Sequence, residues 1–194
     1  EFITLIKERD EENASYLASL AREEAVKIYE NGVFPRGLVE FTNYCKNNCY
    51  YCGIQGSNQH ANRYRLSKDE ILSACENGYQ LGYRSFVLQG GEDPHYSDDV
   101  MVPIVSEIRK RYQDCAITLS LGERSKESYQ KLYDAGADRY LLRHEAATPE
   151  LYQKLHPESL SLENRIQCLW NLKEIGYAVG TGFMVGAPYQ TVEN

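Results

Sequence analysis

Three cysteines within eight residues form the part of the chain best suited to carry chemistry. Cys45, Cys49 and Cys52 follow the spacing C-x3-C-x2-C in the run CKNNCYYC. Thiolates this close can hold one iron–sulfur cluster together, and a [4Fe–4S] cluster that only transfers electrons takes four cysteines. The next cysteine along the chain is Cys75, which is far away in sequence. We therefore predict a [4Fe–4S] cluster held by three thiolates, whose fourth iron is open to bind and activate a small molecule.

A zinc site or a set of unliganded thiols would also explain these cysteines. Zinc could be held in a Cys3His arrangement with His60 as the fourth ligand, although structural zinc sites usually present their ligands as two spaced pairs. The other cysteines, Cys75, Cys115 and Cys168, are scattered singly, and we interpret them as small apolar residues of the core. The spacing favours the open iron–sulfur cluster over both alternatives.

The chain around the cysteines alternates between short apolar runs and amphipathic helices. Such alternation is typical of right-handed parallel β–α units. About five strands fit, fewer than the eight of a complete barrel. We therefore predict an α/β fold, a partial (β/α) TIM-type barrel, with Ser67 and Ser125 as helix N-caps. The predicted strands are 37–42, 84–88, 115–121, 138–143 and 177–185, and the predicted helices between them are 67–81, 98–112, 125–135 and 161–175.

A helical segment precedes the predicted barrel. Residues 10–31 carry apolar side chains at helical spacing and end near Gly32. We divide the chain into an N-terminal helical segment, residues 1–36, and a barrel domain, residues 37–194. The low number of strands leads us to expect that the C-terminal part of the barrel is missing from this chain.

Composition narrows the class of protein. The chain has 194 residues, of which 42% are hydrophobic, enough for one domain with its own core. A net charge of −7 argues against a nucleic-acid partner, and the lack of a long apolar run argues against a membrane span. Six cysteines outside the framework of a small secreted domain indicate a reducing compartment, so we predict a cytoplasmic protein.

Active sites of parallel barrels lie at the carboxyl ends of the strands, so the residues after each predicted strand are candidates. The cysteine loop follows the first strand, and the polar run 89–94 ends the second. Gly90 and Gly91 could form only a β-turn, or their missing side chains could let a ligand approach the backbone. The segment 120–124 after the third strand could be a solvated loop or part of the site.

Arg143 and Glu145 follow the fourth strand and form a candidate pair of opposite charges. They are two residues apart, so on an extended strand they would point to the same side. Opposite charges at a barrel mouth are costly unless they are paired or used. We therefore predict that they bind a ligand, with Arg165 on the next helix either joining them or lying on the surface. We interpret the histidines His60, His95 and His156 as surface or turn residues.

These motifs resemble those of the radical S-adenosylmethionine (SAM) superfamily, in which C-x3-C-x2-C follows the first strand and Gly-Gly-Glu ends the second. The longer runs VEFTNYCKNNCYYCG, QGGEDPHY, TLSLGE and GADRYLLRHEAATPELYQKLHP are more narrowly similar to the radical SAM maturases of [FeFe] hydrogenase, the HydE type. The resemblance covers the chain from about residue 37 to its end. Biotin synthase and methylornithine synthase are relatives that share the first motif.

The resemblance implies two cofactors and the residues that hold them. Cys45, Cys49 and Cys52 would hold the [4Fe–4S] cluster, and SAM would bind the open iron through its amino and carboxylate groups. An electron from the cluster would then cleave SAM to methionine and a 5′-deoxyadenosyl radical. By matching positions, the SAM-binding residues would be Tyr51, Gly91, Glu92, Ser120, Glu145 and Arg165, and the substrate residues would be Gln89, Thr118 and Arg143.

The resemblance also implies a role and partners. The role would be in assembly of the H-cluster of [FeFe] hydrogenase, on a small-molecule or iron-complex substrate. A reductant protein and other hydrogenase maturation proteins would be the partners. Two alternatives stay open: a radical SAM enzyme like biotin synthase or methylornithine synthase, and a zinc-binding module without catalysis.

Overall fold

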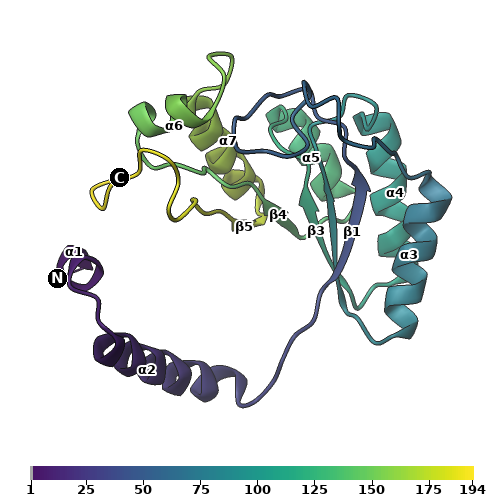
Figure 1. Cartoon of the computed structure of the whole chain (residues 1–194). Coiled ribbons are helices and arrows are strands. Elements are labelled where there is room, and N and C mark those ends of the chain that lie inside the picture. Colours follow the sequence, from purple (N-terminus) through teal and green to yellow (C-terminus); the bar gives the residue numbers. More distant parts are fainter. Residues whose placement is uncertain (1) are drawn as a thin grey trace.

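The computed structural model describes residues 2–194 and contains one five-stranded sheet in which neighbouring strands run parallel (Figure 1). Each strand lies beside the one that precedes it in the chain, as expected for successive β–α units. The predicted α/β architecture of about five parallel strands is confirmed. The strands, in the order in which they pair, are β1 (Gly37–Thr42), β2 (Ser85–Gly90), β3 (Ala116–Ser120), β4 (Arg139–Leu141) and β5 (Ala178–Gly180).

Helices cover one face of this sheet and leave the other face open. Alternate strand residues such as Phe41, Phe86 and Leu119 point toward the helices and are buried in the main core. The predicted core positions of Cys75, Cys115 and Cys168 are confirmed, since all three are buried. The covering helices are α3 (Lys68–Gln80), α4 (Asp98–Arg111), α5 (Lys126–Asp134) and α7 (Leu162–Ile175).

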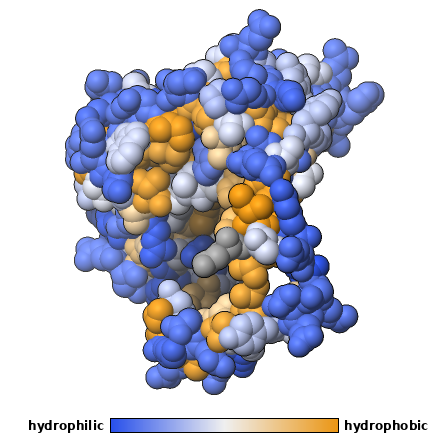
Figure 2. Space-filling view, turned by 90° about the vertical axis from the view of Figure 1, so that its left-hand side faces the viewer, coloured by the Kyte–Doolittle hydropathy of each residue, from blue (hydrophilic) through white to orange (hydrophobic). Residues whose placement is uncertain are grey.

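The open face carries the intervening residues of each strand in register. Leu38, Val87 and Thr118 form one row across β1, β2 and β3, and Glu40, Gln89 and Ser120 form the next row toward the carboxyl ends. Leu38 is 55% exposed although it lies on a sheet. Figure 2 shows hydrophobic residues gathered around a hollow on the side of the molecule where the sheet is uncovered.

The two helix N-caps predicted from the sequence, Ser67 and Ser125, are both formed in the structure. Ser67 forms a capping box with Glu70, whose side chain accepts from the Ser67 backbone N–H, while Ser67 Oγ accepts from the Glu70 N–H. Ser125 caps α5 more simply, since its Oγ accepts from the Ser128 N–H without a reciprocal bond. Both predicted N-caps are therefore confirmed.

The N-terminal residues form two exposed helices, α1 (Phe2–Lys7) and α2 (Glu11–Tyr29). The second confirms the helix predicted over 10–31, and Asp10 caps it by accepting from the Asn13 N–H. Neither helix has a buried residue, and Figure 1 shows α2 away from the sheet. None of the helices in residues 2–194 combines the length and hydrophobicity that crossing a bilayer requires.

Three features of the second half differ from the sequence-based prediction. The strands predicted over 138–143 and 177–185 are much shorter, because the ladder between β4 and β5 ends where the chain reaches Gly180 and Gly182, and glycine weakens strand interiors. Helix α6 (Pro149–Leu155) was not predicted. Its sequence signal is Thr148 as N-cap followed by proline at the first helical position.

Candidate functional site

The three predicted cluster ligands lie on the loop of residues 43–67, which joins β1 to α3 at the carboxyl end of the sheet. The loop has almost no regular structure, so its backbone polar groups need other partners. The Arg63 guanidinium supplies several of them, since it donates to the carbonyls of Asn43, Ile54 (3.0 Å) and Gln55 (2.6 Å). Because these carbonyls come from both sides of the cysteines, Arg63 ties the two ends of the cysteine segment together.

Gly91 lets this loop pack directly on the end of β2. A β-carbon at Gly91 would lie 2.2 Å from the Tyr44 carbonyl oxygen and 2.8 Å from Cys45 Cβ. The next residue, Glu92, accepts a hydrogen bond at its backbone oxygen from the Lys46 N–H (3.0 Å). The structure thus requires glycine here for contact between two backbones, and the predicted contact of Gly91 with SAM stays a prediction.

The thiols of Cys45, Cys49 and Cys52 are all free and half-buried. Burial raises the pKa of Cys49 to about 11; the Tyr51 hydroxyl lowers it, while the nearby thiols of Cys45 and Cys52 raise it further. The three sulfurs are therefore near enough to interact, and they form a soft donor set of the kind that iron–sulfur clusters use.

A single ion is a poorer fit for the same residues. Within residues 2–194, no three His, Cys, Asp or Glu side chains are gathered in a way that could hold one metal ion. His60, which was considered as a fourth zinc ligand, is exposed. The donor set fits a cluster in which each thiolate binds a different iron, an arrangement that spreads the sulfurs further apart than one ion does.

Glu92 brings a carboxylate with an unused acceptor to the cysteine loop. Its side chain is only 10% exposed, and Oε1 accepts from the Glu123 backbone N–H (3.0 Å). Oε2 lies 3.3 Å from the Lys46 ammonium but has no partner of hydrogen-bond geometry in residues 2–194. A buried carboxylate oxygen that is left without a hydrogen bond is well suited to bind a cationic or N–H group of a ligand.

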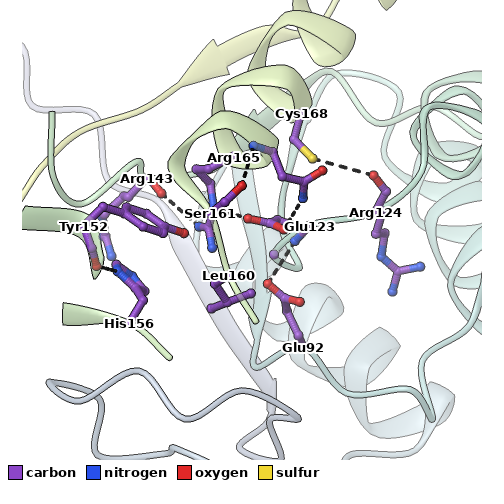
Figure 3. Close-up of polar contacts among 12 residues, drawn as sticks. Glu92, Glu123, Arg124, Arg143, Tyr152, His156, Leu160, Ser161, Arg165 and Cys168 are labelled. Carbon is purple, nitrogen blue, oxygen red and sulfur yellow. Dashed lines mark hydrogen bonds and ion pairs between the residues drawn. The ribbon is translucent and has the colours of Figure 1, made fainter. Parts of the chain in front are cut away.

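A buried ion pair between Glu123 and Arg165 forms the centre of the charged rim (Figure 3). Arg165 Nε donates to Glu123 Oε1 (2.6 Å), and Arg165 Nη1 donates to the Arg143 backbone carbonyl (2.9 Å). Burial alone would lower the pKa of Arg165, but Tyr152 and Glu123 outweigh it and raise that pKa above its ordinary value. Arg165 therefore joins the rim, while its ion-pair partner, Glu123, was not singled out from the sequence.

The sequence analysis expected Arg143 and Glu145 to point to the same side of a strand, but in the structure neither residue lies on a strand. Strand β4 ends at Leu141, and Glu145 has a φ of 63°, a left-handed conformation that is costly for a residue with a side chain. The Glu145 N–H donates to Gly182 and its carbonyl accepts from Met184, which pins this turn to the segment after β5. Burial raises the pKa of the Glu145 carboxyl, against the lowering effect of Arg143 and Arg165.

Two of the three predicted substrate residues line one pocket on the open face. A pocket of about 250 Å³ is lined by Gln89 and Arg143, together with Ser120, which was predicted to bind SAM. Gln89 Nε2 donates to Glu40 Oε1 (3.2 Å). Glu40 and Arg143 both line this pocket, so it carries both signs of charge. Thr118 lies one row lower on the sheet and lines a different pocket with Arg139.

Tyr51 is held by a histidine that the sequence analysis interpreted as a surface or turn residue and that is in fact buried. His156 follows α6 and is only 1% exposed. Its Nε2 lies 2.9 Å from the Tyr51 hydroxyl, and its ring stacks on Tyr152. His60 and His95 are exposed as predicted. The error at His156 arose because α6 was not predicted. His156 directly follows this helix and lies buried between it and the cysteine loop.

The chain matches the Radical SAM superfamily over residues 39–194. This agrees with the resemblance that the cysteine spacing and the Gly-Gly-Glu segment indicated. The match begins within β1 and includes every element of the sheet and the rim described above.

Two characterised relatives are similar over most of this chain. The [FeFe] hydrogenase maturase subunit HydE of Thermotoga maritima is 48% identical over 178 residues, which are 92% of this chain and 50% of that protein. The 3-methylornithine synthase of Methanosarcina barkeri is 32% identical over 185 residues, 94% of this chain and 52% of that protein. The chain thus spans about half the length of these relatives.

Solved structures agree on the architecture. Methylornithine synthase superimposes with a TM-score of 0.90 at 29% identity, covering 99% of this chain and 56% of that one. HydG, a maturase of the [FeFe]-hydrogenase, superimposes with a TM-score of 0.80 at 26% identity, covering 92% of this chain and 41% of that one. The five strands and their helices therefore form part of a radical SAM TIM-type barrel.

A methyl group at Gly91 tests the packing of the cysteine loop. We expect Gly91→Ala to push the loop off β2, because the new β-carbon would overlap the Tyr44 carbonyl. Reconstituted protein should then hold less than half the iron of the parent protein. Gly53→Ala, where a β-carbon meets no atom within 4 Å, is the matched control and should retain its iron. Equal iron in both variants would contradict the packing role.

Asp93 should make the stability of this rim dependent on pH. Burial alone would raise the pKa of Asp93, but bonds from Arg65, the His95 N–H and Thr42 lower it overall. A lowered folded-state pKa contributes stability that is present above the unfolded value of about 3.9 and is lost as pH falls through the folded pKa.

We therefore expect Asp93→Asn to cost about 1.5–3 kcal/mol in urea unfolding at pH 7 and progressively less below about pH 4. Asp99→Asn, at an exposed carboxylate, is the control. A difference between Asp93→Asn and the parent protein that is the same at pH 7 and pH 3 would contradict this assignment.

Proposed function

The chain belongs to the radical SAM superfamily, and we propose that it cleaves S-adenosylmethionine reductively at a [4Fe–4S] cluster held by Cys45, Cys49 and Cys52. When bound, this cluster supplies the electron that splits SAM into methionine and a 5′-deoxyadenosyl radical. The protein's contribution is to hold the two cofactors together, orient them and exclude water.

One observation carries this proposal: the cysteine loop and an under-satisfied buried carboxylate meet on the same rim. The backbone bond from Lys46 to Glu92 holds the two segments together. Glu92 Oε2 has the exposed Lys46 ammonium 3.3 Å away but accepts no well-formed hydrogen bond, and the amino group of SAM would provide one. A structural zinc module would have no use for an under-satisfied buried carboxylate beside its ligands.

The remaining predicted SAM residues would bind the rest of the cofactor. We assign Glu145 to a hydroxyl or amino group of SAM, since its strained backbone and half-buried carboxyl are typical of a functional position. Arg165 would contribute a fixed positive charge, held in place by Glu123. Tyr51, Gly91 and Ser120 would complete the pocket.

The substrate would bind on the open face beside these residues. We assign Gln89 and Arg143 to it because they line one pocket with Glu40. A guanidinium suits an anionic group, and the Glu40–Gln89 pair suits a donor. Thr118, one row deeper, would contact a larger substrate only at its far end.

Among radical SAM reactions, we propose hydrogenase maturation. The identity of 48% with HydE exceeds the 32% with 3-methylornithine synthase over similar lengths. The substrate would then be a small molecule or an iron complex, and the partners a reductant protein and other hydrogenase maturation proteins. A methylornithine synthase-like reaction is the second candidate, favoured by the close superposition with that enzyme.

We further propose two functional parts and a reducing cellular location. Residues 1–36 would act as a helical segment separate from the barrel of residues 37–194, since α1 and α2 have no buried residue. Six free thiols are compatible with the cytoplasm, where thiols stay reduced.

Replacing any one ligand cysteine tests the cluster. We expect Cys45→Ala, Cys49→Ala and Cys52→Ala to abolish reductive SAM cleavage, because two thiolates hold a cubane weakly. Parent protein reconstituted anaerobically should contain about four irons. Cys75→Ser, in the core, is the control and should retain that iron at a cost of roughly 1–2 kcal/mol in stability. One zinc per chain and no iron in the parent protein would favour the zinc-binding module instead.

A binding experiment should distinguish the proposed SAM-binding residues of the rim from the proposed substrate residues. We expect Glu145→Gln to weaken SAM binding roughly 10- to 100-fold, the effect of losing one charge-assisted hydrogen bond of about 1.5–3 kcal/mol. Arg143→Ala should bind SAM normally and lose substrate turnover. Arg165→Ala is a poorer test, since it would also leave Glu123 buried without its partner. Unchanged SAM affinity in Glu145→Gln would show that the SAM pocket lies elsewhere.

A further inference from the structure

His156 is a buried polar side chain to which the proposed function assigns no role. It follows α6 and lies between that helix and the cysteine loop. Its ring stacks on Tyr152 with centroids 3.8 Å apart and meets the Tyr51 ring edge-on at 5.3 Å. The Tyr50 N–H donates to the Leu155 carbonyl (3.0 Å), so the backbones of the two segments are joined beside this histidine.

The hydrogen bonds of His156 determine which of its nitrogens carries the proton. Nδ1 lies 2.8 Å from the Tyr152 backbone carbonyl, a contact drawn in Figure 3. A carbonyl oxygen only accepts, so Nδ1 must be the protonated nitrogen. Burial lowers the pKa of His156, which keeps the ring neutral near pH 7. In a neutral ring with Nδ1–H, Nε2 has no proton and can only accept.

The tautomer in turn fixes the hydroxyl of Tyr51. Nε2 lies 2.9 Å from that hydroxyl, so Tyr51 must donate its proton to His156. Its oxygen then faces the rest of the site only with lone pairs. A phenol that was free to rotate could either donate or accept, whereas this one is restricted to accepting.

The oxygen of Tyr51 lies where a bound ligand would pass. Burial raises the pKa of the Tyr51 hydroxyl, and the Cys49 sulfur, Glu145 and Arg165 all lie near enough to affect that pKa. Tyr51 is 41% exposed, so it is accessible from the mouth of the site. Because its one proton is already given to His156, the Tyr51 hydroxyl has none left for the Cys49 sulfur and can accept from a ligand bound beside it.

We propose that His156 is a positioning residue that fixes the Tyr51 hydroxyl as a hydrogen-bond acceptor for an N–H or O–H group of the ligand bound beside Cys49. This inference rests on the proposed function, in which that ligand is SAM. It gives the site a preference at this point: donor groups of the ligand are accepted, and carboxylate or carbonyl oxygens are repelled.

A histidine that serves only packing would not require this arrangement. Stacking on Tyr152 needs an aromatic ring but no nitrogen, so phenylalanine would fill the space. The double hydrogen bond, from the Tyr152 carbonyl through the imidazole to the Tyr51 hydroxyl, is the feature that phenylalanine cannot reproduce.

The tautomer can be measured directly on the chain without iron. Long-range ¹H–¹⁵N correlation spectra of protein with ¹⁵N-labelled histidine distinguish Nδ1–H from Nε2–H rings, and His156→Phe identifies the signal among the four histidines. We expect His156 to carry its proton on Nδ1 near pH 7. A proton on Nε2, or on both nitrogens, would overturn the proposal, because Tyr51 would then be free to donate to the ligand.

The coupling to ligand binding can be measured with a double-mutant cycle on reconstituted protein. We expect Tyr51→Phe and His156→Phe each to weaken SAM binding between roughly 2- and 10-fold, the range for one neutral hydrogen bond. The double variant should bind no more weakly than either single variant. His156→Gln, whose amide oxygen can accept from Tyr51, should recover part of the affinity lost in His156→Phe.

A matched control and two outcomes complete the test. Tyr50→Phe removes the hydroxyl of a neighbouring tyrosine that is 62% exposed, and SAM affinity should be unchanged. Additive losses in the double variant, at equal iron content and melting temperature, would overturn the positioning role. If the parent protein held its cluster but bound no SAM, the proposed function itself would fail and the ligand role with it, whereas the tautomer would still be measured independently.

Discussion

The close backbone contact between the cysteine loop and the end of β2 is the constraint on which the site depends. Residues 43–67 contain no helix and only an isolated bridge, so they cannot satisfy their own polar groups through a regular ladder. Gly91 allows the Tyr44 carbonyl to lie against the strand end, and Arg63 collects the loop carbonyls from both sides of the cysteines. The positions of all three thiols follow from these two contacts. A cluster bound there would add its own free energy to a loop that is otherwise held by hydrogen bonds, ion pairs and a few packing contacts.

The charged rim is arranged for ligand binding more than for stability. A buried ion pair such as Glu123–Arg165 gains little over well-packed apolar residues, because removing both charges from water is expensive. The same rim leaves Glu92 Oε2 without a well-formed hydrogen bond, although Lys46 is near it, and holds Glu145 in a strained backbone conformation. Each of these features costs free energy in the protein alone. Together they are understandable if a ligand with complementary groups recovers part of that cost when it binds.

The sequence predicted the local features of the fold better than the contacts between distant segments. Apolar runs identified all five strands, and Ser67 and Ser125 marked helix starts, since a cap depends on residues only three positions away. Glu145 was misjudged because its direction is determined by bonds to Gly182 and Met184, which come from a different β–α unit. His156 was misjudged for a similar reason, since its burial depends on an unpredicted helix packing on the cysteine loop. The resemblance to a family supplied site residues that no spacing rule could have selected.

The rim is built from loops of several β–α units, so its side chains come from segments that are far apart in the sequence. Glu92 follows β2, Glu123 follows β3, and Glu145 follows β4, while Tyr51 and the thiols follow β1. Parallel strands bring all these loops to one edge, so a single ligand can contact every one of them. Direct bonds already join adjacent members: the Glu123 N–H donates to Glu92, and Arg165 spans from Glu123 to the Arg143 carbonyl. Displacement of one loop would therefore disturb its neighbour's hydrogen bonds, so the affinity of the site for SAM should reflect the order of the whole rim rather than of any one residue.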